Sequence, residues 1–346
     1  MTILIPHEFE GRLLRSYLTH TLSLSTATIS RLKNHERGIV VNGERVTVRY
    51  VLHTGDVLEL ADRDTPDTAT RTVLPADLPL DILYEDDRLI ALNKPAGMPT
   101  HPSHGHLTDT LANALAWRYA TRGEPFVFRP LGRLDRNTSG VVIAAKTRAV
   151  SGFLGRALQE GRVIKRYLAV LEGELALPAG GTGYIDAPIH RVAASGIRRN
   201  VCSADAEGAE RALTAYRVLA VAEGHTLVLA EPKTGRTHQL RVHFTHVGHP
   251  LVGDDLYGSP DPRMARHALH ALSLSVPLPF VRAIEGGDIP MPSLEAHTPL
   301  NIPSPDGYLH TLASLPSDMK GLLRRYFPGM AEAISGMDTA ARLIRL

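Results

Sequence analysis

The stretch from residue 132 to residue 147 limits the possible fold more than any other part of the chain. Polar and charged residues crowd into residues 132–140, and the apolar run 141–145 follows directly. The apolar run predicts a buried strand, while Gly140 permits a backbone conformation that other residues resist. The Asn-Thr-Ser run at 137–139 can hydrogen-bond to its own backbone and stiffen the turn. We therefore expect a rigid loop that holds Asp135 at the start of a buried strand.

Composition excludes several classes of protein. The 346 residues suggest two or three domains, and the 38 basic and 36 acidic residues nearly cancel, so net charge says little about partners. The single cysteine, Cys202, excludes a disulfide framework and a cysteine-based zinc site and fits a reducing cytosol. The N-terminus lacks a signal-peptide pattern, and no apolar run reaches membrane-spanning length. We expect a soluble, cytoplasmic protein that does not act on a membrane.

Residues 1–62 are predicted to form a small α+β module of their own. Two helical patterns precede apolar runs that flank Asn42-Gly43, a dipeptide that strongly indicates a hairpin. Residues 11–50 contain seven basic and two acidic residues, and such a local excess can bind RNA phosphates without reading the base sequence. The alternative is a generic α+β module whose basic face is only solvated.

From residue 63 onward the chain changes character. Residues 63–77 are polar, lack a periodic apolar pattern and are interpreted as a linker. Strand patterns then outnumber helical ones over residues 78–322 and do not alternate regularly with helices, although an amphipathic helix is predicted at 107–120. This favours the α+β class, with a mixed, largely antiparallel central sheet flanked by helices. A helical tail is predicted for residues 323–346.

Three stretches, in this order along the chain, resemble the RluA-type pseudouridine synthases. They are Arg133-Leu134-Asp135 with Thr138-Ser139-Gly140, then Lys165-Arg166-Tyr167, and then Gly235-Arg236-Thr237-His238-Gln239-Leu240-Arg241-Val242-His243. Each motif alone is weak, but the ordered set is specific, and further matches extend the resemblance over about residues 80–320. Residues 1–62 are similar to the S-four-like RNA-binding domain that several members carry. A pseudouridine synthase-type catalytic domain is therefore expected over residues 78–322.

The resemblance implies the reaction and its principal residues. Uridine within an RNA chain would be isomerised to pseudouridine, with no cofactor and no metal. Asp135 is implied to be the nucleophile or covalent stabiliser, Tyr167 the ring that lies against the target base, and Arg241 the partner of the aspartate. At an ordinary tyrosine pKa of about 10, about 0.1% of such side chains are ionised at pH 7, which favours stacking over a phenolate base. Proton abstraction by Tyr167 is the alternative if the site shifts its pKa. The target base must leave its stack, which is easiest in single-stranded or loop RNA.

Further basic residues are predicted to contact RNA. With an S-four-like module ahead of the catalytic domain, ribosomal RNA of the large subunit is the preferred target, and transfer RNA is the second. DNA is not expected as a partner, and the protein is expected to be a monomer. The predicted contacts are Arg133 and Arg236 in the catalytic domain and Arg31, Lys33 and Arg37 in the N-terminal module.

Two positions depart from the resemblance. Gly132 stands where the family pattern implies a histidine, and His267 stands where it implies a glutamine. Neither is one of the three principal residues. Gly132 nevertheless bears on how the loop contacts RNA, and hence on the choice of target.

The histidines and carboxylates of the sequence bear on three alternative functions. Four histidines between residues 238 and 249 are spaced by five, three and three residues, whereas zinc sites on helices prefer two histidines four apart. Three more histidines lie within residues 101–106. A metal hydrolase is therefore an alternative, and the spacings disfavour it. A non-catalytic RNA-binding protein would not need Asp135. A base-releasing glycosidase would need a second catalytic carboxylate, and the motifs contain no paired candidate.

Overall fold

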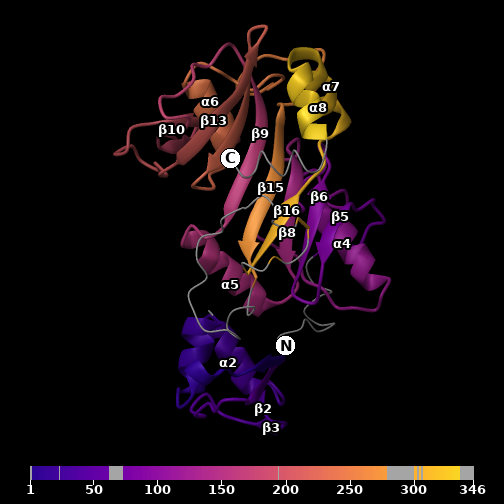
Figure 1. Cartoon of the computed structure of the whole chain (residues 1–346). Coiled ribbons are helices and arrows are strands. Elements are labelled where there is room, and N and C mark those ends of the chain that lie inside the picture. The colour runs from indigo at the N-terminus through magenta and orange to yellow at the C-terminus, as the bar shows by residue number, and fades with distance from the viewer. Residues whose placement is uncertain are drawn as a thin grey trace.

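Two sheets, of four and ten strands, organise the chain (Figure 1). The computed structural model describes residues 2–22, 24–61, 73–193, 195–278, 300–301, 304 and 307–335. The four-stranded sheet is built from the first described ranges, and the ten-stranded sheet from residues that follow the predicted linker. The predicted α+β class is confirmed, because the strands do not alternate regularly with helices along the chain.

The N-terminal module packs a four-stranded antiparallel sheet against short helices. Asn42 and Gly43 have φ angles of 51° and 85°, the positive values that a tight two-residue hairpin needs, so the predicted hairpin is confirmed. Ser25 caps a helix by accepting a hydrogen bond from the Thr28 amide at 3.1 Å. In sheet order the strands are β1 (Thr2–Leu4), β4 (Val57–Leu60), β2 (Ile39–Val41) and β3 (Glu44–Arg45), and the helices are η1 (His7–Phe9), α1 (Leu14–Ser16), η2 (Tyr17–Thr21) and α2 (Thr26–Asn34).

The module contacts the rest of the protein through α5 (Arg148–Gln159). Ala149 of this helix is fully buried in the apolar cluster of the module. The Arg156 guanidinium donates a hydrogen bond to the Thr19 carbonyl oxygen at 3.4 Å. Figure 1 shows the module beside α5 at one end of the large sheet. Helix α5 therefore borders both the module and the large sheet.

The large sheet is mixed and largely antiparallel, as predicted. Strand β15 runs parallel to β8, with His270 opposite Ser139, and every other pair within the described ranges is antiparallel. A two-stranded ribbon, β11 (Ile189–Arg191) with β12 (Arg199–Val201), lies apart from this sheet. The sheet order is β10 (Gly183–Asp186), β13 (Leu213–Ala222), β14 (His225–Pro232), β9 (Ile164–Glu172), β15 (Leu269–Pro277), β8 (Ser139–Ala145), β6 (Leu89–Lys94) and β5 (Ile82–Glu85), with β16 (Tyr308–Leu312) paired to β15 and β7 (Arg129–Pro130) to β8.

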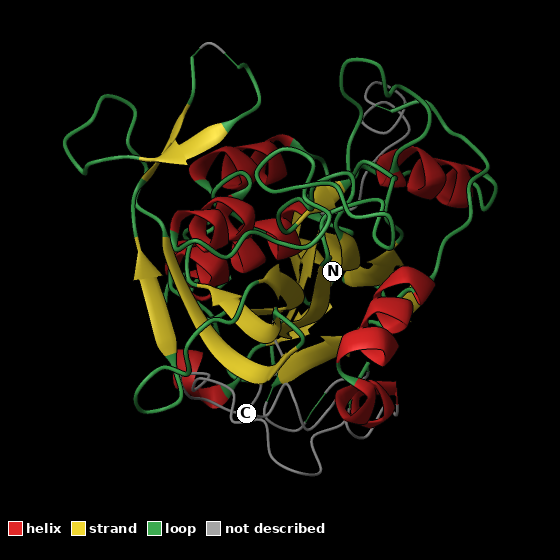
Figure 2. Ribbon diagram, turned by 90° about the horizontal axis from the view of Figure 1, so that it is seen from above, coloured by secondary structure: helices red, strands yellow, loops and turns green. Residues whose placement is uncertain are grey.

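Helices cover both faces of the large sheet (Figure 2). On β9, Ala169 packs with α6 (Gln239–His246), and its neighbour Leu168 packs on the opposite face with α7 (Ser317–Tyr326) and α8 (Pro328–Ser335). On β8, Ile143 packs with α5 and its neighbour Val142 packs with α4 (Leu111–Ala120). We call the face covered by α5 and α6 the front face. Tyr167 of β9 belongs to the cluster that α6 covers, so its ring lies on the front face.

Some element boundaries differ from the prediction. The helix expected at 107–120 begins only at Leu111, because Thr110 and Asn113 form a capping box in which each backbone amide donates to the other side chain, at 3.1 and 3.3 Å. Helix α7 crosses the boundary predicted at residue 322 between the catalytic domain and the helical tail. Helix α8 ends at Ser335, and the remainder of the predicted tail lies outside the described residues. Most of the predicted linker also lies outside them. Within the described ranges, no helix is long and apolar enough to cross a membrane.

Candidate active site

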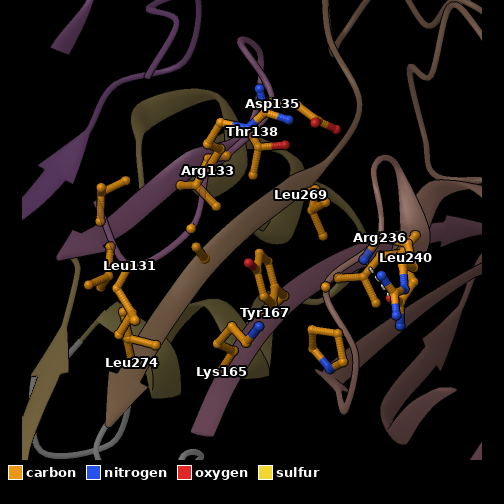
Figure 3. A pocket seen from close by; sticks show the side chains of 18 of the residues that line it. Leu131, Arg133, Asp135, Thr138, Lys165, Tyr167, Arg236, Leu240, Leu269 and Leu274 are labelled. Atoms are coloured by element: carbon orange, nitrogen blue, oxygen red, sulfur yellow. Dashed lines mark hydrogen bonds between the residues drawn. The ribbon is translucent and has the colours of Figure 1, made fainter. Parts of the chain in front are cut away.

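A cavity of about 180 Å³ opens on the front face between α5 and α6. Asp135 lies at one end of it, on the loop that leads into β8, and Arg241 of α6 forms part of the same wall. Tyr167 and Lys165 project into the cavity from β9, with Lys165 on the side away from Asp135 (Figure 3). The structure therefore brings together three residues, Asp135, Tyr167 and Arg241, that are far apart in the sequence.

The backbone on both sides of Asp135 is fixed by hydrogen bonds from the segment after β6. On one side, the Thr100 hydroxyl donates to the Leu134 carbonyl oxygen at 3.0 Å and accepts from the Leu134 amide at 3.2 Å. On the other side, the Arg136 carbonyl oxygen accepts from the Gly97 amide at 2.9 Å. Asp135 is thus held between two anchored residues, and its side chain, which is 29% exposed, still reaches the cavity.

Lys94, the last residue of β6, ties the two segments together. Its ammonium is fully buried and donates to three carbonyl oxygens, those of Pro95 at 2.8 Å, Met98 at 2.7 Å and Arg136 at 3.1 Å. Burial lowers the pKa of Lys94 to about 7, helped by the positive charge of Arg266 and opposed by the Asp135 carboxylate. The ammonium form is the one that can satisfy all three carbonyl oxygens at once.

Strand β8 approaches β15 closely just after this loop. Gly140 has a φ angle of 115° and lies so near β15 that a Cβ there would be 2.1 Å from the Ala271 carbonyl oxygen. The Thr138 hydroxyl shares a hydrogen bond of 2.8 Å with Nε2 of His267, which precedes β15. Only glycine fits at position 140. Together these contacts fix the position of the Asp135 loop relative to β15.

Arg241 is oriented by a buried carboxylate rather than by Asp135. Its Nε and Nη2 atoms each donate to Asp254 at 2.7 Å, whereas its Nη1 atom lies 3.7 Å from the Asp135 carboxylate. Asp254 is fully buried, and Arg241 is 6% exposed. Burial alone would raise the pKa of Asp254, but the hydrogen bonds and charge of Arg241 lower it. The pair leaves one guanidinium nitrogen free to face Asp135.

His238 is a second neighbour of Asp135. It has a φ angle of 58°, in the left-handed region, directly before α6. Its Nε2 atom lies 3.9 Å from the Asp135 carboxylate, and its Nδ1 atom shares a hydrogen bond of 2.9 Å with the Tyr257 hydroxyl. Burial lowers the pKa of His238, although the Asp135 carboxylate opposes the shift. At 3.9 Å the imidazole lies beside the Asp135 carboxylate without a hydrogen bond to it.

The ring of Tyr167 is suited to stacking. Burial raises the pKa of the Tyr167 hydroxyl above its ordinary value, and the Asp135 carboxylate raises it further. The phenol therefore stays protonated at neutral pH, so its ring can lie against a base but its oxygen is not a ready proton acceptor. Stacking of Tyr167 against the target base stays a prediction.

Of the other predicted RNA contacts, two line the cavity and three lie in the N-terminal module. Arg133 is exposed and lines the cavity. Arg236 also lines it, but its guanidinium already donates to the Glu210 carboxylate at 2.9 Å and to the Arg211 carbonyl oxygen at 3.0 Å. Arg31, Lys33 and Arg37 lie on or just after α2 in the N-terminal module, and the latter two are exposed.

Several site residues were not singled out from the sequence. Lys94 and Asp254 fall only within the further matches to the family, in Lys94-Pro95-Ala96-Gly97-Met98 and Gly253-Asp254. Gly253, with a φ angle of 71°, is nevertheless the kind of residue that marks a special turn. Gly132, which the sequence did single out as a departure from the family pattern, has a φ angle of 109° and open space around its Cβ position, and it lines the cavity. No three metal-binding side chains gather anywhere in the part of the chain that the structure describes. His243, one of the clustered histidines, instead shares hydrogen bonds with Thr214 and the Ala187 carbonyl oxygen, both at 2.9 Å.

Comparison with known proteins identifies the family. Residues 88–246 match the model of the RNA pseudouridylate synthase family. An uncharacterized RNA pseudouridine synthase of Bacillus subtilis, YhcT, is 37% identical over 273 residues, which cover 78% of this chain and 87% of the relative. The ribosomal large subunit pseudouridine synthase D of Zymomonas mobilis is 36% identical over 245 residues, covering 69% of this chain and 74% of the relative.

The fold agrees with these matches. The structure of human RNA pseudouridylate synthase domain containing 4 superposes with a TM-score of 0.50 at 24% identity, covering 71% of this chain and 92% of that one. At that identity the likeness speaks for the fold, and the sequence relatives speak for the family. The chain belongs to the RluA-type family of RNA pseudouridine synthases, isomerases that convert uridine in RNA to pseudouridine.

Proposed function

We propose that this chain forms pseudouridine in large-subunit ribosomal RNA, with Asp135 as the nucleophile. One observation carries the proposal. The Asp135 carboxylate reaches the front-face cavity, and its direction is set by anchored backbone on both sides and by the Arg241 guanidinium 3.7 Å away. The choice of RNA rests on relatives named ribosomal large subunit pseudouridine synthase D, such as that of Zymomonas mobilis.

The reaction exchanges one bond to the sugar for another. The bond between N1 of uracil and C1′ of ribose breaks, the uracil turns, and its C5 bonds to C1′. The hydrogen on C5 is lost while N1 gains one, so the conversion is a net isomerisation that needs no oxidant. In the proposed reaction the Asp135 carboxylate bonds to C1′ as the N1–C1′ bond breaks, and it leaves again when C5 bonds to C1′. Arg241 holds the carboxylate in one direction, and Tyr167 stacks against the base while it turns.

The target uridine must leave its stack to reach this site. Arg133, exposed at the edge of the cavity, is proposed to bind the RNA there. Residues 1–62 are proposed to act as an S-four-like RNA-binding module, with Lys33 and Arg37 exposed on it, ahead of a catalytic domain at 78–322. Since α5 contacts both parts, RNA held by the module would lie beside the catalytic sheet.

Incubation with defined RNAs tests the proposal. The wild-type protein is incubated separately with large-subunit ribosomal RNA and with transfer RNA made without modifications, and pseudouridines are then mapped by sequencing. Pseudouridine at discrete sites of the ribosomal RNA is expected. Product in transfer RNA alone would overturn the choice of RNA, and no product in either would overturn the proposal.

A further inference from the structure

Among the described residues that line the cavity, Lys165 is the one lysine, and the reaction described above gives it no role. It lies on β9, two residues before Tyr167, and both side chains point into the cavity from the front face (Figure 3). On the neighbouring strand β15, Leu274 lies directly opposite it. On its other side the ammonium approaches the loop after β14, where it lies 3.5 Å from the position that a Cβ on Gly235 would take.

The ammonium of Lys165 has no partner within the described ranges of the chain. Two arginines of the cavity wall are paired, Arg241 with Asp254 and Arg236 with Glu210. A third, Arg133, is exposed to water. Burial lowers the pKa of Lys165, and no carboxylate opposes the shift. Lys165 is half-buried, and a partly desolvated ammonium without a counter-charge is unfavourable in the free protein. Such a charge is expected where an anionic group of a ligand completes the pair.

We propose that Lys165 binds the RNA phosphate adjacent to the target uridine. The inference rests on the proposed function, because it takes RNA as the ligand of the cavity. Phosphates are the groups of an RNA chain that carry a full negative charge at neutral pH, whereas a uracil carbonyl offers only a partial one. A lysine ammonium is a compact charge with three donors, which suits a single phosphate.

The spacing along β9 is consistent with a neighbouring phosphate. Two residues of a strand span about 7 Å, so the Lys165 ammonium is within one nucleotide of a base that stacks on Tyr167. Asp135 lies on the other side of the Tyr167 ring (Figure 3). A phosphate on Lys165 and a ribose at Asp135 would therefore hold the flipped uridine from two sides. Lys165 is in this sense a positioning residue for the substrate.

The salt dependence of RNA binding tests the proposal directly. Wild type, Lys165→Gln and the control Lys233→Gln are titrated with a single-stranded oligouridylate at several salt concentrations. Lys233 is exposed and paired with Glu231, so its replacement removes the same charge outside the front-face cavity. Lys165→Gln is expected to weaken binding by about tenfold and to make the log–log salt slope less steep by about 0.7, the value for one phosphate on a single strand. The control is expected to leave both unchanged.

Two further measurements separate a phosphate contact from other roles. A contact made equally in the ground and transition states raises KM and leaves kcat unchanged. Since the ammonium lacks a partner in the free protein, Lys165→Gln and Lys165→Met are expected to unfold at the same temperature as wild type or higher. An unchanged salt slope, a fall in kcat at constant KM, or a lower unfolding temperature for both variants would overturn the proposal.

Failure of this inference can be told apart from failure of the proposed function. Binding to oligouridylate is measured without turnover, and pseudouridine mapping in ribosomal RNA is measured separately. Pseudouridine formation by wild type, with an unchanged salt slope for Lys165→Gln, would overturn the role of Lys165 alone. A changed slope with no pseudouridine in any RNA would overturn the proposed function and leave an RNA-phosphate site at Lys165.

Discussion

Removing the negative charge of Asp254 is expected to damage both stability and activity. Asp254 accepts two hydrogen bonds of 2.7 Å from Arg241, and its Oδ1 atom also accepts from the Leu256 and Tyr257 amides at 3.1 and 3.0 Å. Asparagine offers one oxygen instead of two and turns an NH₂ group toward a guanidinium that can only donate. The variant Asp254→Asn therefore leaves the buried Arg241 with an incomplete partner.

The neighbouring Asp255 offers a matched control. It also faces Arg241, but at 3.8 Å and with a side chain that is 73% exposed, whereas Asp254 is fully buried. Breaking a buried ion pair destabilises a protein by about 3–5 kcal/mol, while an exposed pair contributes about 0–1 kcal/mol. Asp254→Asn is thus expected to lower the free energy of unfolding several times more than Asp255→Asn, although both remove one charge beside the same arginine.

Urea unfolding of the two variants and wild type at pH 7 measures this difference. Under conditions in which Asp254→Asn is still folded, its kcat is expected to fall by about 10²-fold, because Arg241 no longer holds Asp135 in one direction and misplacement by about 1 Å has an effect of this size. Equal destabilisation by the two variants, or a loss below about 1 kcal/mol for Asp254→Asn, would refute the reasoning.

The same pair predicts a pH dependence. The pKa of Asp254 is lower in the folded protein than in the unfolded chain, where it is about 3.9. Its contribution to stability is therefore complete above that value and is lost as the pH falls through the folded pKa. The stability gap between wild type and Asp254→Asn is expected to narrow below about pH 4. A gap that stays constant into strong acid would contradict the assignment of the pair.

Two other substitutions test the support of the Asp135 loop. Gly140→Ala is expected to destabilise the protein by several kcal/mol more than Gly132→Ala, because both have positive φ but only Gly140 places a Cβ against a backbone oxygen, at 2.1 Å; similar urea midpoints would contradict this. Lys94→Met leaves three buried carbonyl oxygens without their donor, so the free energy of unfolding should fall by about 2–5 kcal/mol. Pseudouridine formation should also fall, even at temperatures where circular dichroism shows a folded chain. Retained activity and stability in that variant would show that Lys94 does not tie the loop.

The sequence predicted best those helices and strands whose conformation depends on neighbouring residues in the chain. The Asn42-Gly43 hairpin follows from two residues that accept positive φ, and the run before Ala145 is buried on both faces because helices α4 and α5 pack on opposite sides of β8. The helix expected from residue 107 begins only at Leu111, because the Thr110 and Asn113 capping box fixes its first turn there, although the apolar pattern extends back to Leu107. Strand β16 was not predicted, since its residues mix polar and apolar types and its burial comes from pairing with β15.

In the candidate active site, the sequence indicated some residues, and only the folded chain shows the contacts of the others. Asp135, Tyr167 and Arg241 were linked by resemblance, because no local rule joins residues that lie on a loop, a strand and a helix. The role of Asp254 depends on a long-range ion pair that only the folded chain displays. The place of His238 beside Asp135 also could not be predicted from a pattern, because it depends on a φ angle of 58° at a residue that is not glycine.

The most direct test of the account is pseudouridine formation by Asp135→Asn. Both proteins are incubated with the same large-subunit ribosomal RNA, and modified uridines are mapped in each. The account predicts discrete pseudouridines with wild type and none with Asp135→Asn, while both proteins bind the RNA equally and unfold at similar urea concentrations. Equal pseudouridine formation by the folded Asp135→Asn protein would contradict the central claim that the Asp135 carboxylate carries out the chemistry.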